Sequence, residues 1–363
     1  MLASLGQGGP VDSHFEPCAD VPKAGVLIAL PALLASGLWQ HTEEHFQLPP
    51  GYYQLVHVFL LVAFLALARV KSLESLRYCA PGEWGKVLGL DRIPEVRTLR
   101  QKLQWLGQEE KVAAWAGQLS RQWMAEDPQS AGSLYVDGHV RVYNGKKKLP
   151  KAFVTQRNLC SPGTTDFWVN DVDGDPVFVV TGEANPALTQ VLPKLLREIE
   201  EMAPGRKGLV VFDRGGWSPK LFRQLIEAGW DILTYRKGKR AKHPRSGFVE
   251  RSAIVDEREV TYTLSERTVL LGKKRKLKLR EIAELRDDGG QTIFVTSNFK
   301  LSAVVLAHRM FGRWRQENYF KYMRENFALD ALVDYDSESD NPNRDVPNPL
   351  RKAADRSLAQ ARA

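Results

Sequence analysis

The sequence has few cysteines, no long uninterrupted apolar run and no excess of glycine or proline, and each absence excludes a class of protein. Only 3 cysteines stand among 363 residues, which excludes a disulfide scaffold and favours a reducing compartment. Hydrophobic residues make up 43% and charged residues 26%, with 28 Gly and 20 Pro, so a disordered or collagen-like chain is excluded. The first residues have no basic segment before an apolar run, and we expect no secretory signal.

The most apolar stretch, residues 52–70, is interrupted by polar side chains. Gln54, His57 and Arg69 break it, which leaves an apolar core of Val58–Ala68. A run of that length is more typical of a buried helix than of a membrane span, and we expect a buried helix there.

Positive charge is concentrated in the second part of the chain. Residues 1–130 carry 11 basic and 13 acidic side chains, whereas residues 131–363 carry 40 basic and 30 acidic ones. Three runs hold much of it: Asn144–Lys151 with four lysines, Arg236–Arg245 with six basic residues, and Lys273–Arg280 with six. Such blocks are typical of phosphate-contacting surfaces and indicate nucleic acid as the partner; a solvated surface is the alternative.

Hydrophobic periodicity divides the chain into a helical first part and an α/β second part. We expect a flexible N-terminus at residues 1–24, a helical domain at 25–130, a mixed sheet flanked by helices at 131–335, and a polar tail at 336–363. A β-rich insertion is expected at about 237–290, with short pieces at 259–264 and 267–271. This arrangement of predicted helices and strands is typical of an α/β fold.

Within the second part, the alternation of apolar residues predicts individual elements. Strands are expected at 134–143, 151–157, 175–181, 207–213, 230–236 and 291–296. Helices are expected at 186–201, 218–228 and 302–327.

Three acidic residues lie where metal-dependent chemistry needs them. Asp137 is in the strand YVDGHV, Asp213 ends the buried strand KGLVVFD, and Glu317 is on the last long helix. A carboxylate that ends a buried strand lies at the ligand-facing edge of an α/β sheet. Mg²⁺ prefers oxygen ligands, and two such ions stabilise an in-line phosphoryl displacement. Taken singly, each acid could instead be a turn, cap or helix-surface residue.

The helix around Glu317 carries a column of basic residues. Arg313, Lys321 and Arg324 share a helical face with Glu317, because the successive spacings are four, four and three. This pattern places a carboxylate beside groups that bind phosphate.

These stretches together resemble a bacterial insertion-sequence transposase of the DDE type. The resemblance rests on YVDGHVRVY at Asp137, VVFDRGGWS at Asp213 and RWRQENYFKYMRENFALDALVDY at Glu317, and it covers residues about 90–335. It implies an RNase H-like core in which Asp137, Asp213 and Glu317 hold two Mg²⁺ ions, for which Mn²⁺ can substitute. It also implies hydrolysis of a phosphodiester at the element ends and strand transfer into target DNA.

Within that family the chain resembles the branch marked by Tyr-x2-Arg-x3-Glu-x6-Lys. Arg313 and Glu317 match this motif, whereas Met310 stands in place of the tyrosine and Arg324 in place of the lysine. Arg324 keeps the positive charge and can contact phosphate, but Met310 cannot donate a hydrogen bond.

The resemblance implies double-stranded DNA as the partner, both the terminal inverted repeats and the target, and a homodimer acting on paired ends. It places the protein in the bacterial cytoplasm, at the nucleoid, with no membrane partner. We expect DNA contacts from Arg313, Lys321, Arg324, Arg214, His139, Trp217, Lys146, Lys147, Lys148, Arg236, Lys237, Lys239 and Arg240. The helical domain, with Arg97, Arg100 and Lys102, is expected to help recognise element ends.

Several of these assignments have alternatives. Trp217 could stack on an unpaired base or be a core aromatic, and His139 could orient water or phosphate or make a structural hydrogen bond. The whole chain could be a truncated transposase that binds DNA without cleaving it. A third hypothesis is a zinc peptidase, because His41 and His45 lie in the pattern His-x-x-Glu-His.

Overall fold

The computed structural model describes residues 21, 23–70, 72–107, 109–127, 132–143, 151–154, 159–182, 186–205, 207–238, 242–272, 276–327, 329, 354, 357, 358, 360 and 361. Residues 1–144 and 148–333 belong to one compact unit and the remainder to a second, in which the described residues are helical. The predictions for residues 1–20 and 331–353 lie outside the described residues. So do those for Lys146, Lys147, Lys148, Lys239 and Arg240.

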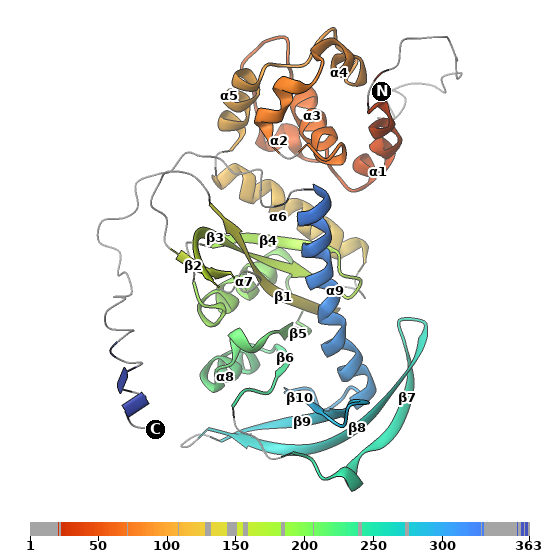
Figure 1. The fold of residues 1–363 in the computed structure, drawn as a ribbon, viewed down its shortest axis with the longest axis vertical. Helices are drawn as coiled ribbons and strands as arrows, with labels where there is room; N and C mark the ends of the chain where they lie inside the picture. The colour runs from red at the N-terminus through yellow and green to blue at the C-terminus, as the bar shows by residue number, and fades with distance from the viewer. Residues whose placement is uncertain are drawn as a thin grey trace. The chain divides into compact units, whose positions relative to one another are not determined.

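The first part of the chain is helical (Figure 1). Its elements are η2 (Ala24–Ala29), α1 (Leu30–Ala35), α2 (Thr42–His45), α3 (Leu55–Leu67), η3 (Leu73–Tyr78), α4 (Pro81–Val87), α5 (Val96–Leu106) and α6 (Glu109–Glu126). The predicted buried helix is confirmed as α3, whose Leu61 and Phe64 lie in a core with Leu99 of α5. No described helix is long and apolar enough to cross a membrane.

Helix α5 carries the basic residues that were expected to recognise element ends. Arg100 forms an ion pair with Glu74 at 2.5 Å. Lys102 is buried, and its ammonium lies 5.9 Å from the centre of the Trp105 ring. Both side chains are therefore engaged within this helical region, and the expected DNA contact stays a prediction.

Among the described residues, ten strands form one sheet in the order β2-β3-β1-β5-β6-β10-β9-β8-β7, and β4 pairs with β3 off this path (Figure 1). In this described sheet the pairs β1–β5 and β5–β6 are parallel and the others are antiparallel. The strands are β1 (Ser133–Val142), β2 (Lys151–Val154), β3 (Leu159–Asn170), β4 (Pro176–Gly182), β5 (Leu209–Phe212), β6 (Asp231–Tyr235), β7 (Val249–Val255), β8 (Arg258–Leu271), β9 (Leu277–Leu285) and β10 (Gln291–Thr296).

The strands predicted outside the insertion are present, whereas β3, β7 and β9 were not predicted as individual strands. The sequence analysis missed β3, which pairs with β1, β2 and β4. Pro162 and Gly163 within β3 indicate a turn, but Gly163 is needed because an added Cβ would lie 2.3 Å from the Arg141 carbonyl oxygen. The two short pieces expected at 259–264 and 267–271 are one continuous strand, β8.

The β-rich insertion extends the main sheet instead of forming a separate body. Strands β7, β8 and β9 form an antiparallel meander that joins β10. Between β6 and β7 the chain has only a short 3₁₀ turn, η7 (Arg245–Gly247), among the residues described. The described residues of this segment are therefore mostly in strands, and its status as an insertion stays a prediction.

Helices cover both faces of the sheet, as the two-residue period of its strands requires. Val136, Val210 and Ile232 pack on the face that carries α7 (Leu188–Met202) and α8 (Pro219–Glu227). Tyr135 and Leu233, one position away, pack on the opposite face against α9 (Ala303–Phe327). The result is a mixed α/β fold, and α9 runs along its second face (Figure 1).

Candidate active site

Two of the three predicted acids lie side by side at one edge of the sheet. In the parallel pair β1–β5, Val136 stands opposite Phe212, so the next residues, Asp137 and Asp213, are neighbours across the two strands. Both follow residues of the α7 face and therefore project toward α9. The carboxyl ends of parallel strands thus bring together two acids that are 76 positions apart in the sequence.

Asp213 also organises the turn that follows its strand. Its Oδ1 accepts a hydrogen bond of 2.8 Å from the Gly215 amide and begins the 3₁₀ turn η6 (Arg214–Gly216). Gly216 is required in this turn, because a Cβ there would lie 2.5 Å from the Phe212 ring. Asp213 therefore caps this turn, as one of the alternative interpretations predicted. The cap uses Oδ1 and not Oδ2, so it is compatible with a further role of the carboxylate at the sheet edge.

A buried glutamine fixes the position of the third acid. Gln316, 1% exposed, donates from its amide to Asn170 Oδ1 at 2.5 Å, and its Nε2 lies 3.2 Å and 3.3 Å from the carbonyl oxygens of Trp168 and Tyr135. These acceptors belong to β3 and β1, next to an irregularity in β3 at 169/170. The amide therefore ties α9 to the strand of Asp137, and Glu317 follows on the same helix.

Arg313 connects the acids on the two elements. Its guanidinium forms an ion pair with Asp137 Oδ2 at 3.1 Å and a second ion pair with Glu317. Asp213 also raises the pKa of Arg313 through its charge, so the guanidinium is within electrostatic reach of all three carboxylates. Asp137 and Glu317 thus meet at Arg313, and Asp213 acts on the same guanidinium through its charge, while their expected role as metal ligands stays a prediction.

The electrostatics of the site favour an added cation. Burial raises the pKa of Asp137 to about 6, and Asp213 and Glu317 add to the rise, while Arg313 opposes it. Three carboxylates facing one guanidinium leave an excess of negative charge in a partly buried place. Groups whose pKa is shifted by burial and by like charges are typical of functional sites.

The three carboxylates have the oxygen ligands that a divalent cation needs, although in this structure they are arranged around the guanidinium of Arg313. All three side chains offer carboxylate oxygens, the ligands that Mg²⁺ and Mn²⁺ prefer. Among the residues described, no three His, Cys, Asp or Glu side chains are grouped closely enough to hold a metal ion. Asp137 and Glu317 instead meet at Arg313, which occupies the place where they converge.

Tyr235 lies at this edge and was not singled out from the sequence. Thr234 pairs with Phe212, so Tyr235 follows beside Asp213. The guanidinium carbons of Arg214 and Arg313 lie 5.7 Å and 6.0 Å from the centre of its ring. Its position in the apolar strand DILTY resembles that of a core residue, so only the register of the sheet reveals its proximity to the acids.

Several predicted DNA contacts are engaged in packing. His139 is buried and stacks on the Phe320 ring with centroids 5.0 Å apart. Trp217 packs against the α7 face of the core, in line with the core alternative, and Arg236 lies 5.3 Å from the centre of its ring. Arg236 also pairs with the buried Glu281 at 3.4 Å. Their contact with DNA stays a prediction.

Other predicted contacts are more accessible. Arg214, Lys237 and Lys321 are exposed, and Arg324 is partly exposed. Lys321 and Arg324 continue the face of α9 that carries Glu317, as predicted from their spacing. Met310 is completely buried in the core between α9 and the sheet, so it does not take part in this edge.

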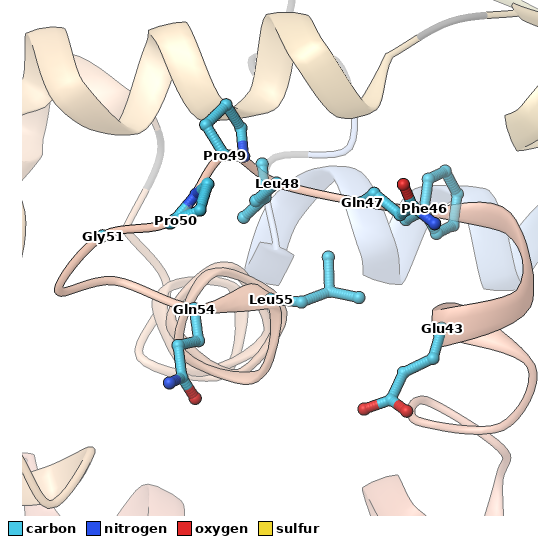
Figure 2. A pocket seen from close by; sticks show the side chains of 9 residues that line it. All are labelled: Glu43, Phe46, Gln47, Leu48, Pro49, Pro50, Gly51, Gln54 and Leu55. Atoms are coloured by element: carbon cyan, nitrogen blue, oxygen red, sulfur yellow. The ribbon is translucent and has the colours of Figure 1, made fainter.

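A pocket of about 500 Å³ lies elsewhere, between the end of α2 and the start of α3. Figure 2 shows Leu48, Pro49 and Leu55 along its wall, and none of the three acids lines it. The histidines of the zinc-peptidase hypothesis lie near this segment. His41 contacts Glu44 at 3.0 Å and His45 contacts Gln118, so each ring has an ordinary protein partner.

Comparison with known proteins gives the following matches. A family model described as "Transposase protein" matches residues 2–360. No curated protein matches the sequence. Among solved structures, the chain is similar to a piggyBac transposase synaptic complex with hairpin DNA, at 9% identity and a TM-score of 0.44, over 82% of this chain and 66% of that one.

A second solved structure, the Mos1 transposase paired-end complex with left transposon end, is similar at 12% identity and a TM-score of 0.21, over 59% of this chain and 68% of that one. The Mos1 mariner paired end complex with Mn matches at 10% identity and a TM-score of 0.21, over 55% and 64%. The chain thus spans about two thirds of the length of these proteins.

Proposed function

The chain belongs to this transposase family, and we propose that it is a DNA transposase of the DDE type with an RNase H-like core. The observation that carries the proposal is the convergence of Asp137, Asp213 and Glu317, from two strands and one helix, on the single cation Arg313. The proposed reactions are hydrolysis of a phosphodiester at the element ends and transfer of the exposed 3′-hydroxyl into target DNA.

In this proposal Asp137, Asp213 and Glu317 hold two Mg²⁺ ions, for which Mn²⁺ can substitute. Such ions supply charge stabilisation for the attacking and leaving oxygens of an in-line displacement. Neither reaction needs a covalent protein–DNA intermediate, so no serine or tyrosine nucleophile is required.

The protein's own residues position the reacting DNA. Gln316 holds α9 against β1 and β3, and this contact fixes where Glu317 lies relative to Asp137. Arg313 and Arg214 offer guanidinium donors to phosphate oxygens at the same edge. Lys321 and Arg324 extend this positive surface along α9, and the basic runs of the insertion add contacts that are independent of sequence.

We further propose double-stranded DNA as the partner, namely the terminal inverted repeats and the target, with a homodimer on paired ends and action at the bacterial nucleoid. The positive charge of residues 131–363 supports a polyanionic partner. His139 is buried and Arg236 is half-buried in its ion pair with Glu281, so in this proposal both position other groups of the site, and contact with DNA is assigned first to the exposed side chains.

Cleavage of DNA that carries the inverted repeats flanking the reading frame tests the proposal. We expect cleavage in Mg²⁺ or Mn²⁺ by the wild type, and a loss of more than about 100-fold in Asp213→Asn, because even residues that only support a metal ligand contribute up to about 100-fold. DNA affinity should be retained in this variant. Asp287→Asn, which changes an exposed acid in the β9–β10 turn, is the matched control and should cleave like the wild type.

The other outcomes contradict the proposal in different ways. Equal cleavage by Asp213→Asn and the wild type would show that the three acids are not the reactive site. Binding of the repeats without cleavage by any variant would support a DNA-binding protein that has lost its catalytic activity.

A further inference from the structure

Tyr235 ends a buried strand beside the second acid, and its side chain projects toward α9. Its neighbour Leu233, two residues earlier, lies in the core on that face, and Tyr235 packs against the same cluster. The parallel register of β5 and β6 then places the tyrosine next to Asp213. A polar aromatic side chain therefore lies at the ligand-facing edge, within the layer that also contains Arg313.

The ring of Tyr235 is contacted by two cations from different elements. Arg214 comes from the turn after β5 and Arg313 from α9, at 5.7 Å and 6.0 Å from the ring centre. A cation on an aromatic face keeps its N–H donors available for an anion. Arg214 is exposed and forms no ion pair with any acid among the residues described, so its positive charge remains uncompensated there.

The hydroxyl of Tyr235 is a donor without a fixed acceptor. It makes no hydrogen bond to any residue in the described part of the chain, whereas the hydroxyl of Tyr262 contacts His308 at 3.2 Å. Burial raises the pKa of Tyr235 further above the usual range of a phenol, which is already protonated at neutral pH. An O–H donor near two guanidinium groups suits an anion with several acceptor oxygens, and phosphate is such an anion.

We propose that Arg214, Tyr235 and Arg313 form a binding site for one DNA phosphate beside the three acids, with the Tyr235 hydroxyl donating to a phosphate oxygen. The inference rests on the proposed function and adds a residue to it. Arg313 takes part through N–H donors other than the two that face Asp137 and Glu317.

The variant Tyr235→Phe isolates the hydroxyl, because it keeps the ring and its contacts with both arginines. Tyr262→Phe is the matched control, since it removes a hydroxyl from the same face of the sheet that is hydrogen-bonded to His308. The probes are duplexes with the flanking inverted repeat, each carrying one uncharged methylphosphonate near the cleavage point. Their dissociation constants are measured at one fixed salt concentration without divalent ions.

For the wild type we expect one methylphosphonate position to weaken binding by about 10-fold, because hydrogen bonds to a charged group are lost there. In Tyr235→Phe the penalty at that position should fall to about 3-fold, and the penalties at other positions should not change. Tyr262→Phe should keep the wild-type pattern.

Equal penalties in Tyr235→Phe and the wild type at every position would overturn the inference, and so would the absence of any sensitive position. The proposed function fails separately, if the wild type does not cleave the unmodified repeat in Mg²⁺ or Mn²⁺. A wild-type protein that cleaves, together with an unaltered pattern in Tyr235→Phe, would leave the transposase proposal standing and remove Tyr235 from the site.

Discussion

The edge of the sheet with three acids and the β-rich insertion differ in how much positive charge compensates their acidic side chains. At the edge, Asp137, Asp213 and Glu317 face one guanidinium, and the pKa of Asp137 is raised to about 6. In the insertion, the single carboxylate of Glu281, 1% exposed, meets two arginines and a histidine.

The insertion also contains an acid whose pKa moves in the other direction. Asp256, in the β7–β8 turn, forms two hydrogen bonds with Arg309 at 2.5 Å and 2.7 Å, and this partner lowers its pKa. Glu281 and Asp256 are thus compensated by positive charges of the protein itself. The acids of the edge lack enough positive charge, which is the property of a site that takes up a cation.

Removal of the charge of Glu281 should cause the largest loss of stability. Glu281→Gln leaves Arg267 and Arg236 without their buried partner, and we expect the free energy of unfolding to fall by about 3–5 kcal/mol. Glu284→Gln, three residues along β9, removes an acid whose pKa is raised by burial and should cost much less. Denaturant unfolding of both variants measures the difference. Equal losses would contradict the inference that the buried ion pairs of Glu281 stabilise the fold.

Removal of the amide of Gln316 should have the next largest effect. Gln316→Leu leaves buried acceptors on Asn170, Trp168 and Tyr135 unsatisfied, and we expect a loss of about 1–3 kcal/mol in the free energy of unfolding. Cleavage of DNA should fall as well, because Glu317 would no longer be held in its position relative to Asp137. Met310→Leu, a change of similar volume in the same helix, should cost less than about 1.5 kcal/mol and leave cleavage intact. Unaltered cleavage in Gln316→Leu would contradict the positioning role.

The pair Asp256–Arg309 should give a smaller effect that depends on pH. Because the folded-state pKa of Asp256 is lowered, its stabilisation is complete above the unfolded pKa of about 3.9 and is lost as the pH falls through the folded pKa. Asp256→Asn should therefore destabilise the protein by about 1 kcal/mol at pH 7. The difference from the wild type should shrink below about pH 4. Unfolding titrations at both pH values check this, and a difference that grows in acid would be inconsistent with it.

Much of the fold could be predicted from the period of the apolar residues. The strand KGLVVFD and the helix at 302–327 have strong patterns, and both are present as β5 and α9. Strand β3 was missed because Pro162 and Gly163 favour a turn, and only pairing with β1 explains why glycine is needed. The sheet-extending role of the insertion depends on the register of β9 with β10, which no local pattern contains.

The candidate site could be predicted only in part. Asp137, Asp213 and Glu317 have sequence surroundings that indicate their place at an edge or on a helix face. Tyr235 and Gln316 have no such signal, because an apolar strand and a polar helix position are common in any protein. Their roles depend on which strand lies beside β5 and on which carbonyl oxygens face α9.

Binding of Mn²⁺ to the protein, measured by isothermal titration calorimetry for the wild type and Asp213→Asn without DNA, tests the account of the three-acid edge most directly. The account predicts that the wild type binds Mn²⁺ and that Asp213→Asn binds it at least about 10-fold more weakly, while Asp287→Asn binds like the wild type. Equal Mn²⁺ affinity in the wild type and Asp213→Asn would show that this edge is not a metal site.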